Sequence, residues 1–216
     1  MRCVFALLVA ATPVAFAAAP AEASPATAKA YVSCLDDRRS ADVGKLLSTS
    51  DADIARRAFA RLNDNGECVA RTYGNAQYDP ADVTMTMGIL RGRLAEQALL
   101  SNEDQVDRLA ALPLQQKRYL RNWFPATSRN LSVDEMGACM ADTDPRGILT
   151  LVETPEGSAA EVDAMAGLAP SLGKCLAIGT RLEADRPSLR AALADALYQR
   201  MKEQAPSQIG SQGASR

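Results

Sequence analysis

Residues 189–198 read Leu-Arg-Ala-Ala-Leu-Ala-Asp-Ala-Leu-Tyr and close the stretch Met136–Met201, which also carries Cys139 and Cys175. Leucine and alanine recur here at helical spacing, and both residue types favour helices. The segment therefore predicts a closing helix with the pattern Leu-Arg-x-x-Leu-Ala-acid.

An earlier part of the chain repeats this order of features. Residues 90–99 read Leu-Arg-Gly-Arg-Leu-Ala-Glu-Gln-Ala-Leu. Two cysteines, Cys34 and Cys68, precede that segment at a separation of 34 positions, against 36 positions for Cys139 and Cys175. The order and the spacing indicate that the chain contains two related parts.

A hydrophobic doublet extends this correspondence. Leu46-Leu47 lies as far beyond the first cysteine of its half as Leu151-Val152 lies beyond that of the other half. The chain therefore predicts an all-α fold of two tandem, degenerate helical units over 27–100 and 132–204, with about four helices in each. Each unit holds one internal disulfide, and the pattern allows a short extended segment before each closing helix. The alternative is one irregular helical domain with two unrelated disulfides.

Composition agrees with a helical protein. The chain has 216 residues, of which 47% are hydrophobic and only 5% aromatic. A unit of about 70 residues buries little apolar surface, so a cross-link matters to its stability. The formal net charge of −2 lacks the basic excess that nucleic-acid binding requires. We therefore expect no nucleic-acid partner.

The first residues have the pattern of an export signal over 1–19. Arg2 supplies a positive start, Val4–Val14 is apolar, and Ala15-Phe16-Ala17 is a small-x-small cleavage motif, with competing sites as far as Ala23. A retained membrane anchor is the alternative, but Pro13 interrupts the short run. We expect a mature protein in the periplasm or outside the cell, with a disordered leader over 20–26, a disordered tail over 205–216 and no transmembrane segment.

Signal cleavage would remove Cys3 and leave an even number of cysteines in an oxidising compartment. Four cysteines allow three pairings, and the repeat selects Cys34–Cys68 and Cys139–Cys175. Each bond would close a loop worth about 3–4 kcal/mol on the chain-entropy model. Free buried thiols are the alternative. Zinc is disfavoured because the sequence has no histidine, and we expect no metal and no cofactor.

Caps and breaks predict the other helix boundaries. Asp51 and Ser158 are expected N-caps, and Asp144-Pro145 is expected to start a helix with proline in its first turn. Val83–Met87 and Arg181–Ala184 are candidates for the extended segments. In the first unit the predicted helices are Thr27–Asp36, a short helix ending at Leu47, 52–62 and Gly88–Leu100, with a polar loop over Arg71–Ala81. Two connector helices are predicted within 101–131: one capped by Ser101 and one over Leu114–Phe124. In the second unit, helices are predicted to start at Ser132, Pro145, Ser158 and Pro187.

Catalytic motifs are scarce. A chain without histidine cannot carry a serine–histidine–aspartate or cysteine–histidine centre, and it has neither a phosphate-binding glycine loop nor a dinucleotide fingerprint. Asp36-Asp37, Asp134-Glu135 and the pair Asp142 and Asp144 could act as acid–base pairs. Helix capping explains them better, so we assign no catalytic residue.

Arginines recur on both closing helices, at Arg91, Arg93 and Arg190. Glu96 and Asp195 lie close enough in sequence to face them, so interhelical salt bridges are the preferred interpretation. An anion-binding site is the alternative.

The connector segment 115–124 is basic and lacks acids. Tyrosine, tryptophan and arginine are common anchors of protein interfaces, and a basic amphipathic helix can also lie on an anionic membrane. The alternative is that the aromatic residues and Leu120 are buried between the two units. The candidate interaction surface consists of Lys117, Arg118, Tyr119, Arg121 and Trp123.

These observations favour an exported, non-enzymatic helical protein with an interaction or structural role in the cell envelope, and a protein or another envelope component as its partner. The alternative is a small-ligand binder or a carboxylate-dependent hydrolase that uses a cleft between the two units. The sequence indicates no particular ligand and no oligomeric state.

Overall fold

The computed structural model describes residues 25–63, 65–74, 85–115, 118–176, 179 and 182–204. Within these residues every regular element is a helix and no strand occurs, which confirms the predicted all-α class. The predicted signal segment 1–19 and the predicted tail 205–216 lie outside the described residues. The elements are α1 (Pro25–Ser48), α2 (Ala52–Leu62), α3 (Gly66–Tyr73), α4 (Met87–Leu100), α5 (Glu103–Asp107), the 3-10 turn η2 (Phe124–Ala126), α6 (Leu131–Thr143), α7 (Pro145–Glu153), α8 (Ala159–Cys175) and α9 (Arg186–Gln204).

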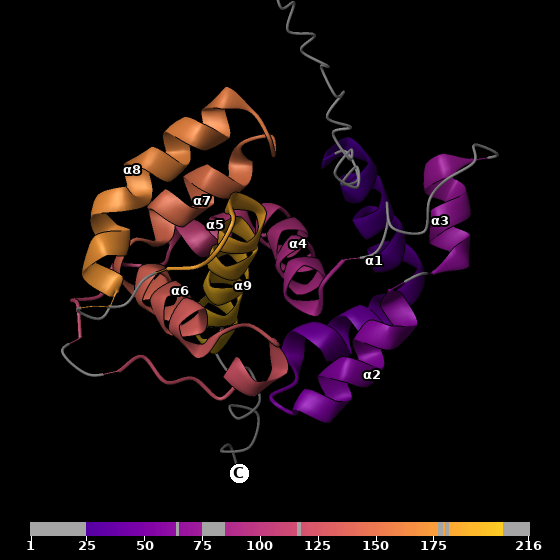
Figure 1. The fold of residues 1–216 in the computed structure, drawn as a ribbon, viewed down its shortest axis with the longest axis horizontal. Coiled ribbons are helices and arrows are strands. Elements are labelled where there is room, and N and C mark those ends of the chain that lie inside the picture. Colours follow the sequence, from indigo (N-terminus) through magenta and orange to yellow (C-terminus); the bar gives the residue numbers. More distant parts are fainter. Residues whose placement is uncertain are drawn as a thin grey trace, which may run out of the picture.

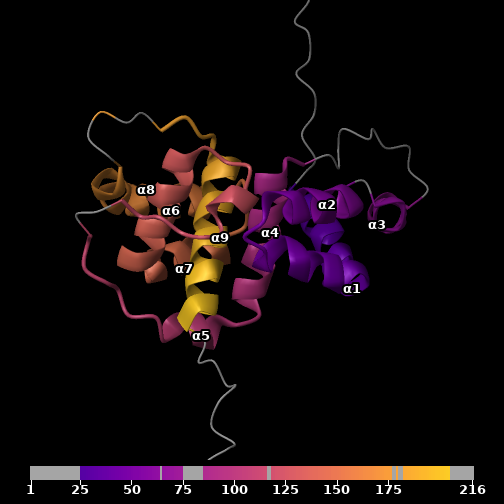
Figure 2. The same ribbon diagram turned by 90° about the horizontal axis from the view of Figure 1, so that it is seen from below.

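The two closing helices, α4 and α9, pack against each other in the middle of the molecule (Figures 1 and 2). Helices α1 to α3 lie on the α4 side, and α6 to α8 lie on the α9 side. Gly92 of α4 makes the close packing possible, because a Cβ at this position would overlap Ala191 of α9. The absence of a side chain at one residue thus lets two helix backbones meet.

Buried apolar residues form two clusters, one on each side of this pair. One cluster is built from α1 to α4 and contains Cys34 and Cys68. The other is built mainly from α6 to α9 and contains Cys139, with Cys175 packed against it. The predicted pairings Cys34–Cys68 and Cys139–Cys175 are both formed, and the Cα–Cα distance is 5.6 Å in each.

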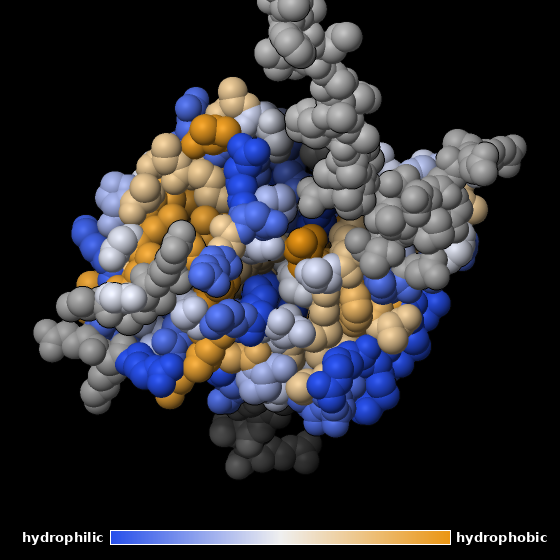
Figure 3. Space-filling model, in the orientation of Figure 1, coloured by the Kyte–Doolittle hydropathy of each residue, from blue (hydrophilic) through white to orange (hydrophobic). Residues whose placement is uncertain are grey.

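The predicted caps of three helices are confirmed. The Asp51 carboxylate accepts from two backbone N–H groups of α2, Ser158 Oγ accepts from the N–H of Glu161, and Asp144 accepts from the N–H of Gly147. Helix α2 is amphipathic: Ala55, Ala58 and Leu62 are buried, whereas its outer surface is hydrophilic (Figure 3, lower right).

Other caps and boundaries differ from the prediction. Asn130, not Ser132, caps α6, because its side chain accepts from the N–H of Ser132. The short α5 has no side-chain cap, so the box expected at Ser101 is wrong. Helix α1 already includes Pro25 and runs through both predicted helices, with a kink at Arg39.

The first three residues of the expected loop over Arg71–Ala81 are helical, and residues 75–81 lie outside the described residues. Asn65 caps an additional helix, α3, by accepting from the N–H of Cys68, and this helix extends to Tyr73. The structure describes no strand before the closing helices: Thr86 caps α4, and residues 182–185 are irregular. Val83, Thr84 and Arg181 lie outside the described residues.

The predicted connector helix Leu114–Phe124 is wrong. Its described residues are irregular up to Trp123, where the 3-10 turn begins. The preceding backbone is bound by distant partners, since the N–H of Leu112 donates to the carbonyl of Asp142 (2.7 Å) and Arg200 donates to the carbonyl of Ala110. These tertiary hydrogen bonds satisfy backbone groups just before the predicted helix and attach the chain there to α6 and α9.

None of the helices that the structure describes is long and apolar enough to span a membrane.

Candidate functional site

Arg91 lies fully buried between α4, α9 and the end of α1. Its Nε donates to Asp195 Oδ2 at 2.7 Å. Its two Nη atoms donate to the carbonyls of Leu46 and Leu47, the second at 3.1 Å. The guanidinium therefore donates hydrogen bonds to carbonyls at the end of α1 and also neutralises a buried carboxylate. The pair Arg91–Asp195 is thus a structural ion pair.

Asp195 is bound by more than one cation. Arg129 Nη2 also donates to its Oδ2, and Gln199 Nε2 donates to its Oδ1 at 3.1 Å. Burial alone would raise the pKa of Asp195, but the charges of Arg91 and Arg129 and their hydrogen bonds outweigh burial. The pKa of Asp195 consequently lies below its ordinary value.

Arg129 joins the network from the segment before α6. Its Nε donates to Asp134 Oδ1 at 2.8 Å, and Thr127 Oγ1 donates to Asp134 Oδ2 at 2.5 Å. Burial raises the pKa of Asp134 in spite of these partners. Burial also opposes the charge of Arg129, but Asp195 and Asp134 overcome it and raise the pKa of Arg129. Sequence reasoning missed Arg129, because no periodicity marks it.

Arg190 of α9 is held in a similar way. Its Nε donates to Glu96 Oε1 at 2.7 Å, and its Nη1 lies 3.2 Å from Glu161 Oε1. Its Nη2 donates to the carbonyls of Val152 (3.0 Å) and Thr154 (2.9 Å) near the end of α7. Salt bridges thus occupy Arg190 as well as Arg91.

Glu96 differs from Asp195 in its electrostatics. Burial raises the pKa of Glu96, and the charge of nearby Glu156 adds to this, while Arg190 compensates only in part. The third arginine, Arg93, pairs with Glu156 at 2.7 Å. All three arginines predicted on the closing helices are therefore in ion pairs.

Arg93, Glu96, Glu156 and Arg190 line a cleft of about 320 Å³. It lies between α1, α4 and the end of α7, so each side of the molecule contributes to it. Exposed Lys29 also lines it and has no ion pair among the described residues. The remaining walls are mainly apolar: Val32, Leu100, Val152 and Pro155, with Ser33, Gln97, Ser101 and Thr154.

The predicted interaction surface does not form one patch. Tyr119 and Trp123 are buried in the cluster on the α9 side, and Lys117 lies outside the described residues. The alternative is also wrong in one respect, because Leu120 is 62% exposed. Arg118 pairs with an acid of α6, Glu135.

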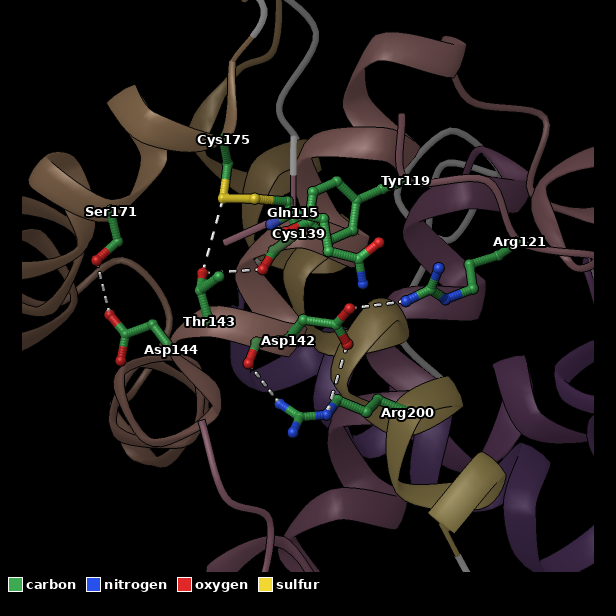
Figure 4. The surroundings of a disulfide bond; sticks show 10 residues. All are labelled: Gln115, Tyr119, Arg121, Cys139, Asp142, Thr143, Asp144, Ser171, Cys175 and Arg200. Atoms are coloured by element: carbon green, nitrogen blue, oxygen red, sulfur yellow. Dashed lines mark hydrogen bonds and ion pairs between the residues drawn. A yellow bond between two sulfur atoms is a disulfide. The ribbon is translucent and has the colours of Figure 1, made fainter. Parts of the chain in front are cut away.

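Arg121 pairs with Asp142 of α6 at 2.8 Å. Figure 4 shows this pair beside the disulfide Cys139–Cys175, with Arg200 of α9 reaching Asp142 from another direction. The connector segment thus crosses α6 and is fastened to it by charge.

Most of the carboxylates considered for acid–base chemistry have structural partners. Asp134 and Asp142 accept from arginines, and Asp144 caps α7 and accepts from Ser171 Oγ at 3.2 Å (Figure 4). Asp36 accepts from the amide of Gln97. Among the described residues, no three acidic or cysteine side chains are grouped to hold a metal ion.

A comparison of the chain with protein-family models, with curated proteins and with solved structures found no match. The candidate site is therefore defined by geometry alone: the cleft that Glu96, Arg93 and Lys29 line.

Proposed function

We propose that this chain is an exported, non-enzymatic helical protein of the cell envelope that acts by binding a partner there. The pair of disulfides carries this proposal, because disulfides form and persist in oxidising compartments. Each bond is set in an apolar cluster, where it links α1 to α3 or α6 to α8. The signal-like residues 1–19 point to the same compartment.

The proposal includes two copies of one helical unit, and reciprocal ion pairs support it. Arg91 and Glu96 on α4 precede Arg190 and Asp195 on α9 by 99 positions each. Arg91 pairs with Asp195, and Arg190 pairs with Glu96. Such an exchange is what a pseudo-twofold axis between the closing helices would produce.

The backbone contacts of these arginines also correspond. Arg91 donates to the carbonyl of Leu47, and Arg190 donates to the carbonyl of Val152. Both acceptors are the second residue of the matching hydrophobic doublets. Two arginines thus perform the same task at the ends of two helices.

A third correspondence concerns the first cysteine of each half. The kink of α1 at Arg39 follows Cys34 by five positions, and the break between α6 and α7 at Asp144 follows Cys139 by the same number. In this proposal α1 of the first unit corresponds to α6 and α7 of the second unit: the helix is kinked after the first cysteine in the first unit and interrupted there in the second.

A second candidate function is binding of a small ligand in the cleft. A partly apolar pocket with a few charged groups is typical of ligand sites, and both proposed units line this one. The hydrolase version has less support, because the carboxylates in the cleft, Glu96 and Glu156, both pair with arginines.

Expression of the full chain in a bacterium that exports proteins tests the main proposal. We expect the periplasmic fraction to hold a form that begins between Ala18 and Ser24, and non-reducing peptide mapping to find Cys34–Cys68 and Cys139–Cys175. Cross-linking in whole cells should then attach the mature protein to an envelope component. A full-length cytosolic product with free thiols would overturn the assignment.

A further inference from the structure

Two corresponding carboxylates in the core differ in their number of partners. Asp195 accepts from Arg91, Arg129 and Gln199. Glu96 accepts from Arg190 alone: Nε and Nη2 of this arginine both donate to Oε1. Within the described part of the chain, no group donates to Glu96 Oε2. Asp195 therefore has three donors, whereas Glu96 keeps one acceptor atom to which no described residue donates.

Arg129 accounts for the difference. It belongs to the connector between the proposed units, so the first unit has no counterpart for it. Its side chain is 8% exposed and also donates to Asp134 and to the carbonyl of Gly88 at 3.1 Å. Arg129 thus acts as an internal cation, bound by two carboxylates and a backbone carbonyl.

The sequence correspondence of the two proposed units relates the cleft to the surroundings of Arg129. Glu96 corresponds to Asp195, and Lys29, five positions before Cys34, corresponds to Asp134, five positions before Cys139. Both Lys29 and Glu96 line the cleft. By this correspondence, no lining residue that the structure describes is the counterpart of Arg129, and the exposed Lys29 stands where the other half has the buried Asp134.

We propose that the cleft binds a basic amino acid, with the guanidinium or ammonium of its side chain on Glu96 Oε2 and its α-carboxylate on Lys29. The inference rests on the two-unit correspondence in the proposed function and assigns a ligand class to the cleft. The apolar walls formed by Val32, Leu100 and Val152 would cover the aliphatic stem of the ligand.

Charge and size agree with this ligand class. The cleft contains the ion pairs Arg93–Glu156 and Arg190–Glu96, and Lys29, which has no ion pair with any residue that the structure describes. A ligand with one cationic and one anionic group adds a partner for both Lys29 and the free oxygen. Burial holds the pKa of Glu96 above its ordinary value, and a bound cation would favour its ionised form.

Calorimetric titration of the purified mature protein with three related compounds tests the proposal. L-arginine has both charged groups, agmatine lacks the carboxylate, and L-citrulline replaces the guanidinium by a neutral group of similar shape. We expect L-arginine to bind, and L-citrulline to bind weaker by about tenfold or more, because a charge-assisted hydrogen bond is lost. Agmatine should fall between the two.

Variants of the cleft separate the roles of the two residues. Glu96→Gln should reduce the affinity for L-arginine to that for L-citrulline. Lys29→Glu gives this position the negative charge of the corresponding Asp134. The variant should bind agmatine more tightly and L-arginine more weakly. Since Lys29 is exposed, this variant stays informative even if Glu96→Gln does not fold.

Equal affinities for L-arginine and L-citrulline would overturn the proposal. So would the absence of binding heat with all three compounds. A Lys29→Glu protein that binds agmatine no more tightly than the unmodified protein would also overturn it. None of these results affects the export and disulfide experiment. A protein that is exported and cross-linked yet indifferent to L-arginine would disprove this ligand class alone.

Discussion

Gly92 of α4 lies against Ala191 of α9, so that a Cβ at Gly92 would overlap both the backbone and the side chain of Ala191. The helices that bring the two proposed units together meet at these residues. We therefore expect Gly92→Ala to lower the free energy of unfolding by about 1–3 kcal/mol or more, because relief of the overlap requires the helices to separate. Urea unfolding followed by circular dichroism measures the change.

The matched control is Gly167→Ala in α8. No atom lies within 4 Å of a Cβ built there, so the protein should be unchanged or more stable by about 0.5–1 kcal/mol. Equal effects of the two substitutions would show that the closing helices do not depend on close packing at Gly92.

The ion pair between Arg91 and Asp195 gives a second prediction. Replacement of Arg91 by methionine keeps much of the side-chain volume but removes one of the cations on Asp195 and the donors to Leu46 and Leu47. We expect a loss of about 3–5 kcal/mol, typical of breaking a buried pair from one side. Arg56→Ala, which removes an exposed pair with Asp53, should cost at most about 1 kcal/mol. Chemical denaturation distinguishes the two, and a similar small effect at both sites would contradict a structural role for Arg91.

Local sequence signals predicted the helical class, the closing helices, three caps and both disulfides. These features depend on periodicity and on residues within a few positions of each other: Asp51 caps the N–H groups of Asp53 and Ile54. The Arg–acid pairing of the closing helices was also predictable, because α4 and α9 carry the same pattern of charges. The cysteine spacing selected the pairing without any knowledge of the fold.

Long-range contacts explain what the sequence did not reveal. The segment Leu114–Phe124 has helical composition but is irregular where the structure describes it. The chain just before it is bound to distant helices, because Leu112 donates to Asp142 of α6 and Arg200 of α9 donates to Ala110. Arg129 was missed because its partners are a near neighbour, Asp134, and the distant Asp195. No pattern of one segment indicates such a contact.

Acid sensitivity should depend on Asp195. Its folded-state pKa lies below the ordinary value, so the folded protein binds fewer protons than the unfolded chain as the pH falls past that value. Stability from this group is therefore complete above about pH 5 and is lost as the pH falls through the folded pKa. Asp195→Asn should flatten this part of the stability–pH curve, as urea unfolding at a series of pH values would measure.

Glu96 should show the opposite sign. Burial raises its folded-state pKa, so the folded protein binds more protons than the unfolded chain between the ordinary and the raised value. Stability from this group declines as the pH rises through that window. Glu96→Gln should remove this decline. A decline that persists in Glu96→Gln would show that another group causes it.

The disulfides should stabilise each side of the molecule separately. Their sequence separations are 34 and 36 residues, and the chain-entropy model assigns about 3–4 kcal/mol to each such loop. Replacement of Cys34 and Cys68 by serine, or of Cys139 and Cys175, should lower the free energy of unfolding by about this amount. If Cys139 and Cys175 were not bonded, a reducing agent would leave the first double variant as stable as before.

Trp123 distinguishes a buried connector from a membrane-binding one. The side chain is 7% exposed, and its Nε1 has no hydrogen-bond partner among the described residues. Its fluorescence emission should therefore be shifted to shorter wavelength in the isolated protein and unchanged by anionic phospholipid vesicles.

A second probe reports on the exposed side of the same segment. Leu120 is 62% exposed, so a protein with Trp123→Phe and Leu120→Trp should emit at longer wavelength. Replacement of Trp123 by phenylalanine forfeits no hydrogen bond that the structure describes, which favours folding of this variant. If vesicles shift the emission of the Leu120→Trp probe but not that of Trp123, the connector binds membranes through its exposed face without unfolding. If vesicles shift neither emission, the role of Arg118 and Arg121 is to bind the connector to Glu135 and Asp142 of α6.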